Sequence, residues 1–408
     1  MPRLLLTVRG PDHPGVTASL FTHLHRHGAV LVDVEQVVVR GALLLGIRVD
    51  VPGADGTVPD DLRDRLTAAA DVLGVDLEVV PAPPDGIDST GAVRQHVTLL
   101  APTVDAGAFA AVAEALASCS VNIERIEMLA SEPVMAYELT ITGGDVASLR
   151  EKLAAVAAES GVDLAVQPAG LVRRGKRLVV FDVDSTLVQG EVVDELAALA
   201  GVGDQVARVT AAAMRGELEF AASLRARVAL LEGLPVSALQ EVRDRMQLTP
   251  GASTLLRTLR RMGYSLGVVS GGFTQIVEPL AADLGLDFAA ANVLEIVDGK
   301  LTGGLVGPLV DRPGKAEALR RFAAEAGVPL PQTVAVGDGA NDLDMLATAG
   351  LGVAFNAKPA VRAAAQASVS VPFLDALLFL LGVPRDEVDA ADLQDDARSD
   401  EANSDNPV

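Results

Sequence analysis

The chain has 408 residues, a length that suggests two to four domains of about 100–200 residues each. Its 33 Lys and Arg residues against 55 Asp and Glu residues give a formal net charge of −22, which argues against nucleic acid or an anionic membrane as a partner. No stretch resembles an export signal or a membrane span, and the single cysteine, Cys119, allows no internal disulfide. We therefore expect a soluble protein of the reducing cytoplasm.

Residues 1–80 predict a small α+β module. Apolar, β-branched runs and helical patterns follow one another in the order strand, helix, strand, strand, helix, strand. The expected elements are Leu4–Val8, Val16–His27, Val30–Val39, Leu43–Val51, Leu62–Leu73 and Val75–Val80. This order predicts one antiparallel sheet with both helices on one face.

A proline-rich linker, residues 81–95, precedes a second copy of the same pattern at residues 96–170. The offset of about 90 residues indicates a duplicated module rather than a solenoid of short repeats. Two consecutive modules of this order resemble ACT domains, the regulatory units that bind amino acids in biosynthetic enzymes. The resemblance implies a homodimer that associates through these modules.

The turn Asp12-His13-Pro14-Gly15 adds to the ACT resemblance, because it offers backbone N–H groups at a helix N-terminus to a carboxylate. By this resemblance Asp12 and Gly15 would help to bind serine or a related amino acid as a regulatory ligand. The matching stretch of the second copy, residues 103–107, lacks the proline and departs from the pattern. The alternative is a pair of modules that serves packing or dimerisation without a ligand.

Residues 173–384 carry the motifs that point to chemistry. Apolar strands are followed by polar loops at three places: Leu178–Phe181 by Asp182-Val183-Asp184-Ser185-Thr186, Ser265–Val269 by Ser270-Gly271-Gly272, and Thr333–Val336 by Gly337-Asp338-Gly339-Ala340-Asn341-Asp342. The carboxyl ends of parallel strands meet at the sheet edge where α/β folds place their sites. Lys315, one of few lysines in an arginine-preferring chain, offers a compact charge suited to a phosphate. The histidines and the cysteine all precede residue 120, so this chemistry uses neither imidazole nor thiol.

Together these motifs, in this order, resemble the haloacid dehalogenase superfamily, whose nucleophile is a carboxylate. The resemblance implies a Rossmann-like parallel sheet and Mg²⁺ as cofactor. Asp182 would attack phosphorus, and Asp184 would serve first as general acid and then as general base. Asp182, Asp338 and the main-chain carbonyl of Asp184 would supply hard oxygen ligands to the ion.

The same resemblance assigns the groups that hold the phosphate. Lys315, Ser270 and the N–H of Gly271 would bind the phosphoryl oxygens. Asp342 would orient Lys315 or the waters on the metal rather than bind the ion itself.

An insert at about residues 191–248 has a helical pattern and is far longer than one crossover needs. In this superfamily such an insert is a cap that sets specificity, and the sequence of this one resembles phosphoserine phosphatases. The implied substrate-binding residues are Arg227 for the carboxylate, Glu191 for the ammonium, Met214 and Phe220 for the apolar lid, and Asn341 for a further polar contact. The implied reaction is Mg²⁺-dependent hydrolysis of O-phospho-L-serine through an aspartyl-phosphate, the last step of serine biosynthesis.

The whole chain is thus expected to contain two βαββαβ modules, a haloacid-dehalogenase-type α/β domain with a helical cap, and a tail. Residues 385–408 are acidic and poor in apolar side chains, which predicts disorder. Two other functions stay open. One is phosphatase or phosphotransferase chemistry on another small phosphorylated amino acid, and the other is an amino-acid sensor with an inert phosphatase domain.

Overall fold

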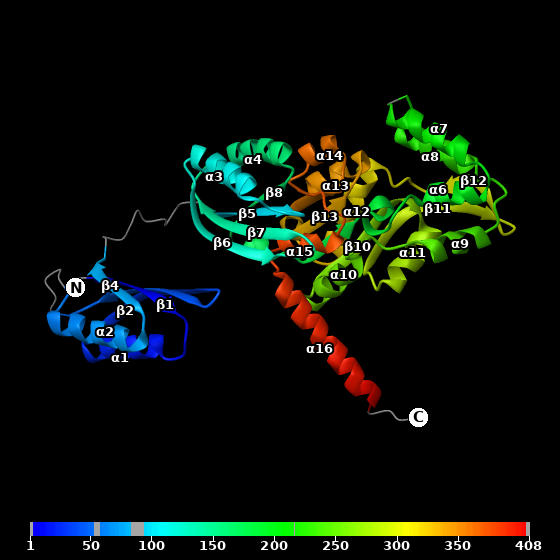
Figure 1. Ribbon diagram of the computed structural model, residues 1–408. Helices are drawn as coiled ribbons and strands as arrows, with labels where there is room; N and C mark the ends of the chain where they lie inside the picture. Colours follow the sequence, from blue (N-terminus) through cyan, green and yellow to red (C-terminus); the bar gives the residue numbers. More distant parts are fainter. Residues whose placement is uncertain (1–2, 53–57, 83–93, 216, 405–408) are drawn as a thin grey trace. The chain divides into compact units, whose positions relative to one another are not determined.

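The computed structural model describes residues 3–52, 58–82, 94–215 and 217–404 (Figure 1). The chain forms two compact units, residues 1–91 and 92–408. Most of the expected linker, residues 81–95, lies outside the described residues. No helix in the described part is long and apolar enough to cross a membrane.

The first unit is the expected βαββαβ module, here called the first module. Its elements are β1 (Arg3–Pro11), α1 (Val16–Arg26), β2 (Val30–Val39), β3 (Ala42–Asp50), α2 (Asp60–Leu73) and β4 (Asp76–Pro81). The sheet has the order β2-β3-β1-β4, and all its pairs are antiparallel. Alternate residues of β1, such as Leu4 and Leu6, are fully buried against Leu20 and Leu62 of the helices, as a sheet with one covered face requires.

The second unit begins with the second module, which has the same order of elements. These are β5 (Arg94–Ala101), α3 (Ala106–Ser118), β6 (Asn122–Ala130), β7 (Met135–Thr142), α4 (Val146–Ser160) and β8 (Asp163–Pro168). The sheet order, β6-β7-β5-β8, repeats that of the first module, and its pairs are again antiparallel. The duplicated α+β fold predicted from the sequence is therefore confirmed.

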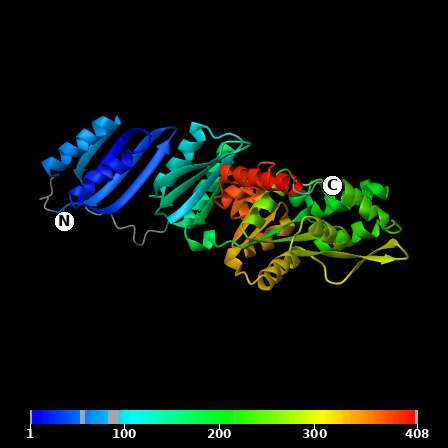
Figure 2. The ribbon, with the colours of Figure 1, turned by 90° about the horizontal axis from the view of Figure 1, so that it is seen from below.

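The rest of the second unit is built on a seven-stranded sheet of order β12-β11-β10-β9-β13-β14-β15, here called the α/β domain (Figure 2). Its strands are β9 (Leu178–Phe181), β10 (Ser265–Phe273), β11 (Phe288–Val297), β12 (Lys300–Val306), β13 (Thr333–Gly337), β14 (Leu351–Phe355) and β15 (Ala367–Val369). All pairs are parallel except β11 with β12. All four residues of the central strand β9 are buried, because helices cover both faces of a parallel sheet.

Two apolar layers enclose this sheet. One face packs with α10 (Ala252–Arg261) and α15 (Leu377–Leu380), and the other packs with α12 (Arg312–Glu325), α13 (Leu343–Thr348) and α14 (Pro359–Ala364). The helix α11 (Thr274–Asp283) follows β10, and the short α5 (Leu171–Arg174) leads into β9. The predicted parallel α/β fold is confirmed.

The insert between β9 and β10 forms a helical cap with its own core. The cap contains α6 (Val192–Leu199), α7 (Gly203–Met214), α8 (Phe220–Ala229) and α9 (Ser237–Arg245). Buried cap residues such as Leu196, Leu224 and Val228 pack with Leu294 and Leu301 of the β11–β12 hairpin. The cap therefore rests on the antiparallel edge of the sheet.

The acidic C-terminal segment is a helix, which corrects the expectation of a disordered tail. α16 spans Arg385–Ser404 (red in Figure 1). Val388 is buried in the apolar core of the α/β domain, and Arg257 and Arg261 of α10 bond Asp392 at 3.0 and 2.5 Å. Composition alone missed this helix because its basic partners lie about 130 residues earlier in the chain. The last four residues lie outside the described part.

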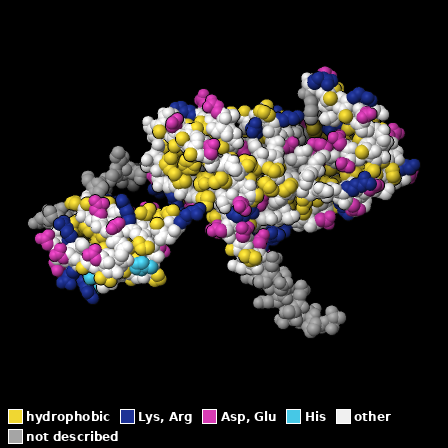
Figure 3. Space-filling model, in the orientation of Figure 1, with side chains coloured by type: hydrophobic (Ala, Val, Ile, Leu, Met, Phe, Trp, Pro, Cys, Tyr) yellow, Lys and Arg dark blue, Asp and Glu magenta, His cyan; other side chains and the backbone are white. Residues whose placement is uncertain are grey.

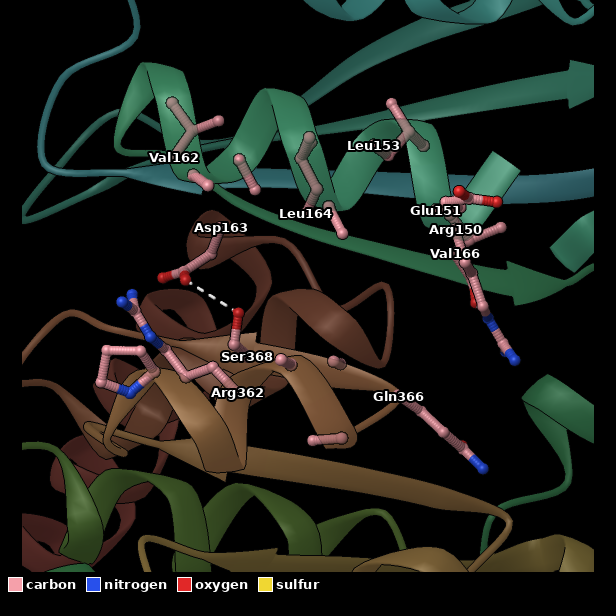
Figure 4. Close-up of a pocket in the computed structure, with 17 residues that line it drawn as sticks. Arg150, Glu151, Leu153, Val162, Asp163, Leu164, Val166, Arg362, Gln366 and Ser368 are labelled. Atoms are coloured by element: carbon pink, nitrogen blue, oxygen red, sulfur yellow. Dashed lines mark hydrogen bonds between the residues drawn. The ribbon is translucent and has the colours of Figure 1, made fainter. Parts of the chain in front are cut away.

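The second module and the α/β domain meet where β8 lies beside β15. Buried Asp163 accepts a hydrogen bond from the Ser368 hydroxyl at 3.0 Å (Figure 4). It also accepts from the Ser370 N–H at 2.5 Å and from the Ser370 hydroxyl at 2.9 Å. The buried Gln167 side chain donates to the Leu380 carbonyl at 2.7 Å. The Gln167 contact is buried and the Asp163 contacts are part-buried, so separating the two parts would break every one of them at a cost in free energy.

A hollow of about 550 Å³ opens at this seam, between α4 and α14 (Figure 4). Its walls are mostly small and apolar, and the polar groups on them are largely bonded within the protein. Asp163 bonds the serines of the α/β domain, and Arg150 donates to the Val166 carbonyl at 3.2 Å. None of the site residues expected from the sequence lines this hollow.

The hydrogen bonds between the second module and the α/β domain lead to a prediction about stability. Asp163→Ala leaves the Ser370 N–H and two hydroxyls without their acceptor, so we expect a loss of about 1–3 kcal/mol in the free energy of unfolding. Urea unfolding of the full chain measures this loss. Glu159→Ala, which alters an exposed acid on α4 of the same module, serves as control and should stay within about 0.5 kcal/mol of the parent. Equal stability of the two variants would contradict the role given to Asp163.

Candidate functional site

The polar loops predicted from the sequence meet at the carboxyl edge of the central strands. β9 pairs in parallel with β10 on one side and β13 on the other, with Phe181 opposite Val268 and Val336. The residues that follow these strands, Asp182 and Asp338 among them, are therefore neighbours. The Asp182 N–H donates to the Val336 carbonyl at 2.8 Å, which continues the ladder to the edge of the site.

Lys315 is the centre of this site. Its ammonium donates to Asp182 Oδ1 at 2.7 Å and to Asp342 Oδ1 at 2.6 Å, and its side chain is fully buried. The residue lies in the first turn of α12, where Asp311 accepts from the Gly314 N–H at 2.9 Å and caps the helix. The cap defines where α12 begins and so where Lys315 enters the cluster. Its two carboxylate neighbours raise the pKa of the Lys315 ammonium despite burial, so the residue stays charged.

Asp184 is held by the loops on either side of it. Its Oδ1 accepts from the Val192 N–H at 2.7 Å, and its Oδ2 accepts from the Ser270 hydroxyl at 3.1 Å. The Gly272 N–H in turn donates to the Ser270 hydroxyl oxygen at 2.7 Å. A Cβ on Gly272 would lie 2.9 Å from that oxygen and 3.3 Å from Asp184, so this close approach requires glycine. The backbone of Ser185 is left-handed, with φ of 57°, and turns the chain sharply after Asp184.

The site holds more negative charge than Lys315 can balance. Burial, then repulsion by Asp342, raises the pKa of Asp182 well above its usual range, and burial raises the pKa of Asp184. Burial, with repulsion by Asp342, brings the pKa of Asp338 to about 6. Burial, with repulsion by Asp184, brings the pKa of Glu191 to about 7. Such a cluster gains stability from a further positive charge.

The geometry of the acids fits a metal ion. One oxygen each of Asp182, Asp338 and Asp342 lies within 4.8 Å of the others. These are the hard oxygen donors that divalent cations of the magnesium type prefer. Asp342 shares its other contacts with Lys315 and with the Gly339 N–H at 2.9 Å, so it also positions the lysine.

The residues expected from the cap and its surroundings reach the site to different extents. Glu191 accepts from the Ser185 hydroxyl at 3.2 Å and acts electrostatically on Asp184 and Asp338. Burial raises the pKa of Asp184, and the positive charge of Arg227 opposes a small part of that rise.

Phe220 lies beside Gly271 near the end of β10, because a Cβ on Gly271 would be 3.4 Å from the Phe220 ring. The strand thus runs on to Phe273 through the residues that the sequence placed in a loop after Val269. Asn341 is half-buried in the turn that carries Asp342. The Met214 side chain lies outside the described residues. Asp12 and Gly15 belong to the first unit.

Two buried side chains support the site without having been predicted. Asn292 of β11 donates to the Gly271 carbonyl at 2.9 Å and accepts from the Val310 N–H at 2.8 Å, so it holds the glycine loop in place. Thr186 donates to Asp338 at 3.3 Å. The available signals were an amide within an apolar strand and the last residue of the Asp-x-Asp-x-Thr motif, and neither reveals its partner.

Comparison with known proteins identifies families for three successive parts of the chain. Residues 179–347 match the haloacid dehalogenase-like hydrolase family, and residues 2–80 and 94–167 each match an ACT domain family. The chain is 55% identical over 400 residues to phosphoserine phosphatase SerB2 of Mycobacterium tuberculosis, which covers 96% of each chain. It is also 55% identical over 399 residues to a phosphoserine phosphatase of Streptomyces coelicolor, covering 97% of this chain and 96% of the relative.

A solved structure is similar over much of the chain. The crystal structure of a probable phosphoserine phosphatase from Vibrio cholerae, in unliganded form, is 36% identical and has a TM-score of 0.56. The match covers 72% of this chain and 87% of that chain.

The buried lysine predicts a charge-dependent stability effect. Lys315→Met leaves Asp182 and Asp342 buried without their cation, so we expect a loss of about 3–5 kcal/mol in the free energy of unfolding. The folded variant keeps a proton on Asp182 that the unfolded chain releases, so the loss should grow as pH rises above the usual aspartate range. Chemical denaturation at several pH values, without added metal, measures both effects.

Two further variants make this test specific. Adding Asp342→Asn to Lys315→Met removes one of the unpaired charges and should restore part of the stability. Lys300→Met, which alters an exposed lysine, should change stability by no more than about 0.5 kcal/mol. A double variant no more stable than Lys315→Met alone would contradict the ion-pair account.

Proposed function

Because the chain belongs to the phosphoserine phosphatases of the haloacid dehalogenase-like hydrolase family, we propose that it hydrolyses O-phospho-L-serine to L-serine and phosphate. In this function it would catalyse the last step of serine biosynthesis. The observation that carries the proposal is the buried cluster in which Lys315 bonds Asp182 and Asp342, with Asp184 and Asp338 beside them. A nucleophilic carboxylate, a second acid and a fixed cation are the groups that phosphoryl transfer through an aspartyl-phosphate requires.

Each step can be assigned to a side chain. An Asp182 oxygen attacks phosphorus, the bond from phosphorus to the serine oxygen breaks, and Asp184 donates a proton to that oxygen. Asp184 then takes a proton from the water that attacks the aspartyl-phosphate, which frees phosphate and restores Asp182. The raised pKa of Asp184 suits a group that must be protonated in the first step.

The carboxylate oxygens of Asp182, Asp338 and Asp342 lie close enough together to fit Mg²⁺. By the family resemblance, Asp182, Asp338 and the main-chain carbonyl of Asp184 would hold the ion. When bound, this ion supplies the positive charge that keeps Asp182 ionised and offsets the charge of the phosphate. Lys315, the Ser270 hydroxyl and the Gly271 N–H would bind the phosphoryl oxygens. Ser270 would turn its hydroxyl from Asp184 towards the phosphate.

The cap supplies the groups that recognise an amino acid. Arg227 would bind the substrate carboxylate and Glu191 its ammonium, and both already act electrostatically on Asp184. Phe220, with Met214, would cover the substrate, and Asn341 would add a polar contact. This pair of charges disfavours phosphosugars, which have no α-amino-acid group.

The nucleophile assignment predicts a complete loss of activity. Asp182→Asn removes the attacking carboxylate, so phosphate release from phosphoserine should fall by about 10⁴-fold or more. The assay is run with Mg²⁺ and again after EDTA, which should abolish the parent's activity. Asp298→Asn, at an exposed hairpin position with φ of 49°, is the control and should keep full activity.

Three outcomes separate the alternatives. Full activity of Asp182→Asn would overturn the carboxylate mechanism. A parent chain that turns over phosphothreonine faster than phosphoserine would favour the alternative substrate class. A parent chain inert towards both would favour the sensor.

Regulation by an amino acid is proposed for the first module only. Gly15 caps α1 with φ of 103° and has no side chain there, so the first amides of α1 carry no side-chain cap. In the second module the Asp105 carboxylate accepts from the Ala108 N–H at 2.7 Å and occupies the equivalent position. The open helix N-terminus beside Asp12 therefore supports binding of a serine carboxylate at the first module.

The same module supports the proposed homodimer. All ten residues of β2, an edge strand, are exposed, although Val30 to Val39 is largely apolar. An exposed apolar edge of this length is a site for pairing with another strand. A second copy of the chain would supply that strand.

The difference between Gly15 at the start of α1 and Asp105 at the start of α3 allows a test of regulation. Gly15→Asp would place a carboxylate where Asp105 stands in the second module, so the heat of serine binding to the full chain should be lost while basal phosphate release is unchanged. Gly28→Asp adds the same charge at the opposite end of α1, also at a left-handed glycine, and should keep the heat. Titration calorimetry measures binding, and sedimentation of the same samples measures the dimer. No heat in the parent chain would refute serine binding.

A further inference from the structure

The cap contains buried hydrogen-bonding atoms that nothing in the described structure satisfies. On α8, the Ser223 hydroxyl and the Nε of Arg227 have no hydrogen-bond partner among the described residues. On α7, the Thr210 hydroxyl is in the same state. Ser223 is only 1% exposed, so bulk solvent does not reach its hydroxyl. Buried polar atoms without partners are rare, so each of these atoms calls for a partner from outside the described residues or another physical explanation.

Ser223 and Arg227 share one face of α8. They are four residues apart, which places them one turn apart on the same side of a helix. Phe220, seven residues before Arg227, lies on this side as well, and its ring lies beside Gly271 of β10. Burial raises the pKa of Asp184, and the positive charge of Arg227 lowers it in part. This face of α8 is therefore turned towards the catalytic cluster.

The unsatisfied atoms define the chemistry of the missing partner. The Nε of Arg227 can only donate a hydrogen bond, and the Ser223 hydroxyl can donate one as well. Two donors one turn apart, one of them charged, suit a carboxylate group with its two oxygens. Leu224 and Val228, on the adjacent side of α8, pack in the cap core, and the two donors are not among the apolar residues of that core.

We propose that the Ser223 hydroxyl binds the carboxylate of the substrate beside Arg227 and makes the cap selective for an α-amino acid. The inference rests on the proposed function, because that function supplies the carboxylate. Thr210 lies on α7, and the proposal does not involve it.

The test compares substrates with and without a carboxylate. Ser223→Ala should raise KM for phosphoserine by about 10- to 100-fold, the cost of one hydrogen bond to a charged group, with little change in kcat. Its kcat/KM for phosphoethanolamine, which has the ammonium but no carboxylate, should stay as in the parent. Ser237→Ala, at an exposed serine of α9, is the control and should match the parent on both substrates. The Mg²⁺-loaded full chain is used throughout.

A double variant separates binding from packing. In an Arg227→Met background, which weakens the carboxylate site, Ser223→Ala should have a much smaller effect on phosphoserine. An equal loss of kcat/KM on phosphoserine and phosphoethanolamine, or no loss on either, would overturn the inference. A parent chain that does not hydrolyse phosphoserine would instead refute the proposed function and this inference with it. Thermal unfolding of Ser223→Ala checks that the cap remains folded.

Discussion

The ion pairs of Lys315 are the interaction on which the rest of the site depends. A fully buried ammonium is stable only next to negative charge, and here Asp182 and Asp342 provide it at 2.7 and 2.6 Å. The strands β9 and β13 bring the acids to one edge of the sheet, and the capped start of α12 brings the lysine to them. The cluster still carries excess negative charge, which is the physical reason that it fits a divalent cation and, in turn, a phosphate.

The two ACT modules share a fold but differ in what surrounds them. The second is attached to the α/β domain through Asp163 and Gln167, and its helix α3 is capped by its own Asp105. The first forms a separate unit, and its helix α1 begins at Gly15 without a side-chain cap. The copies therefore differ in how their first helix begins and in whether they belong to the same compact unit as the α/β domain.

Local patterns were enough to predict most of the fold. Four buried residues in β9, followed by Asp182 and Asp184, are readable because apolar periodicity and a motif act within a few residues. The acidic C-terminal segment was predicted wrongly for the opposite reason. Its helix is paired by Arg257 and Arg261, which are distant in sequence, and composition contains no information about such partners. Asn292 was missed on the same ground, since its bonds to Gly271 and Val310 exist only in the folded chain.

The sequence by itself determined the class of fold, the order of the domains and the type of chemistry, because these follow from periodicity and from motifs of adjacent residues. It also placed the histidines and the cysteine outside the α/β domain, and the resemblance of its motifs to the haloacid dehalogenase superfamily implied a carboxylate nucleophile. Only the tertiary structure decided that Lys315 is fully buried between two acids, that the second module is attached through Asp163, and that α16 is a helix. The tertiary structure also showed that the Ser223 hydroxyl is buried with no hydrogen-bond partner among the described residues. Burial and pairing depend on residues far apart in the chain, and folding is what brings them into contact.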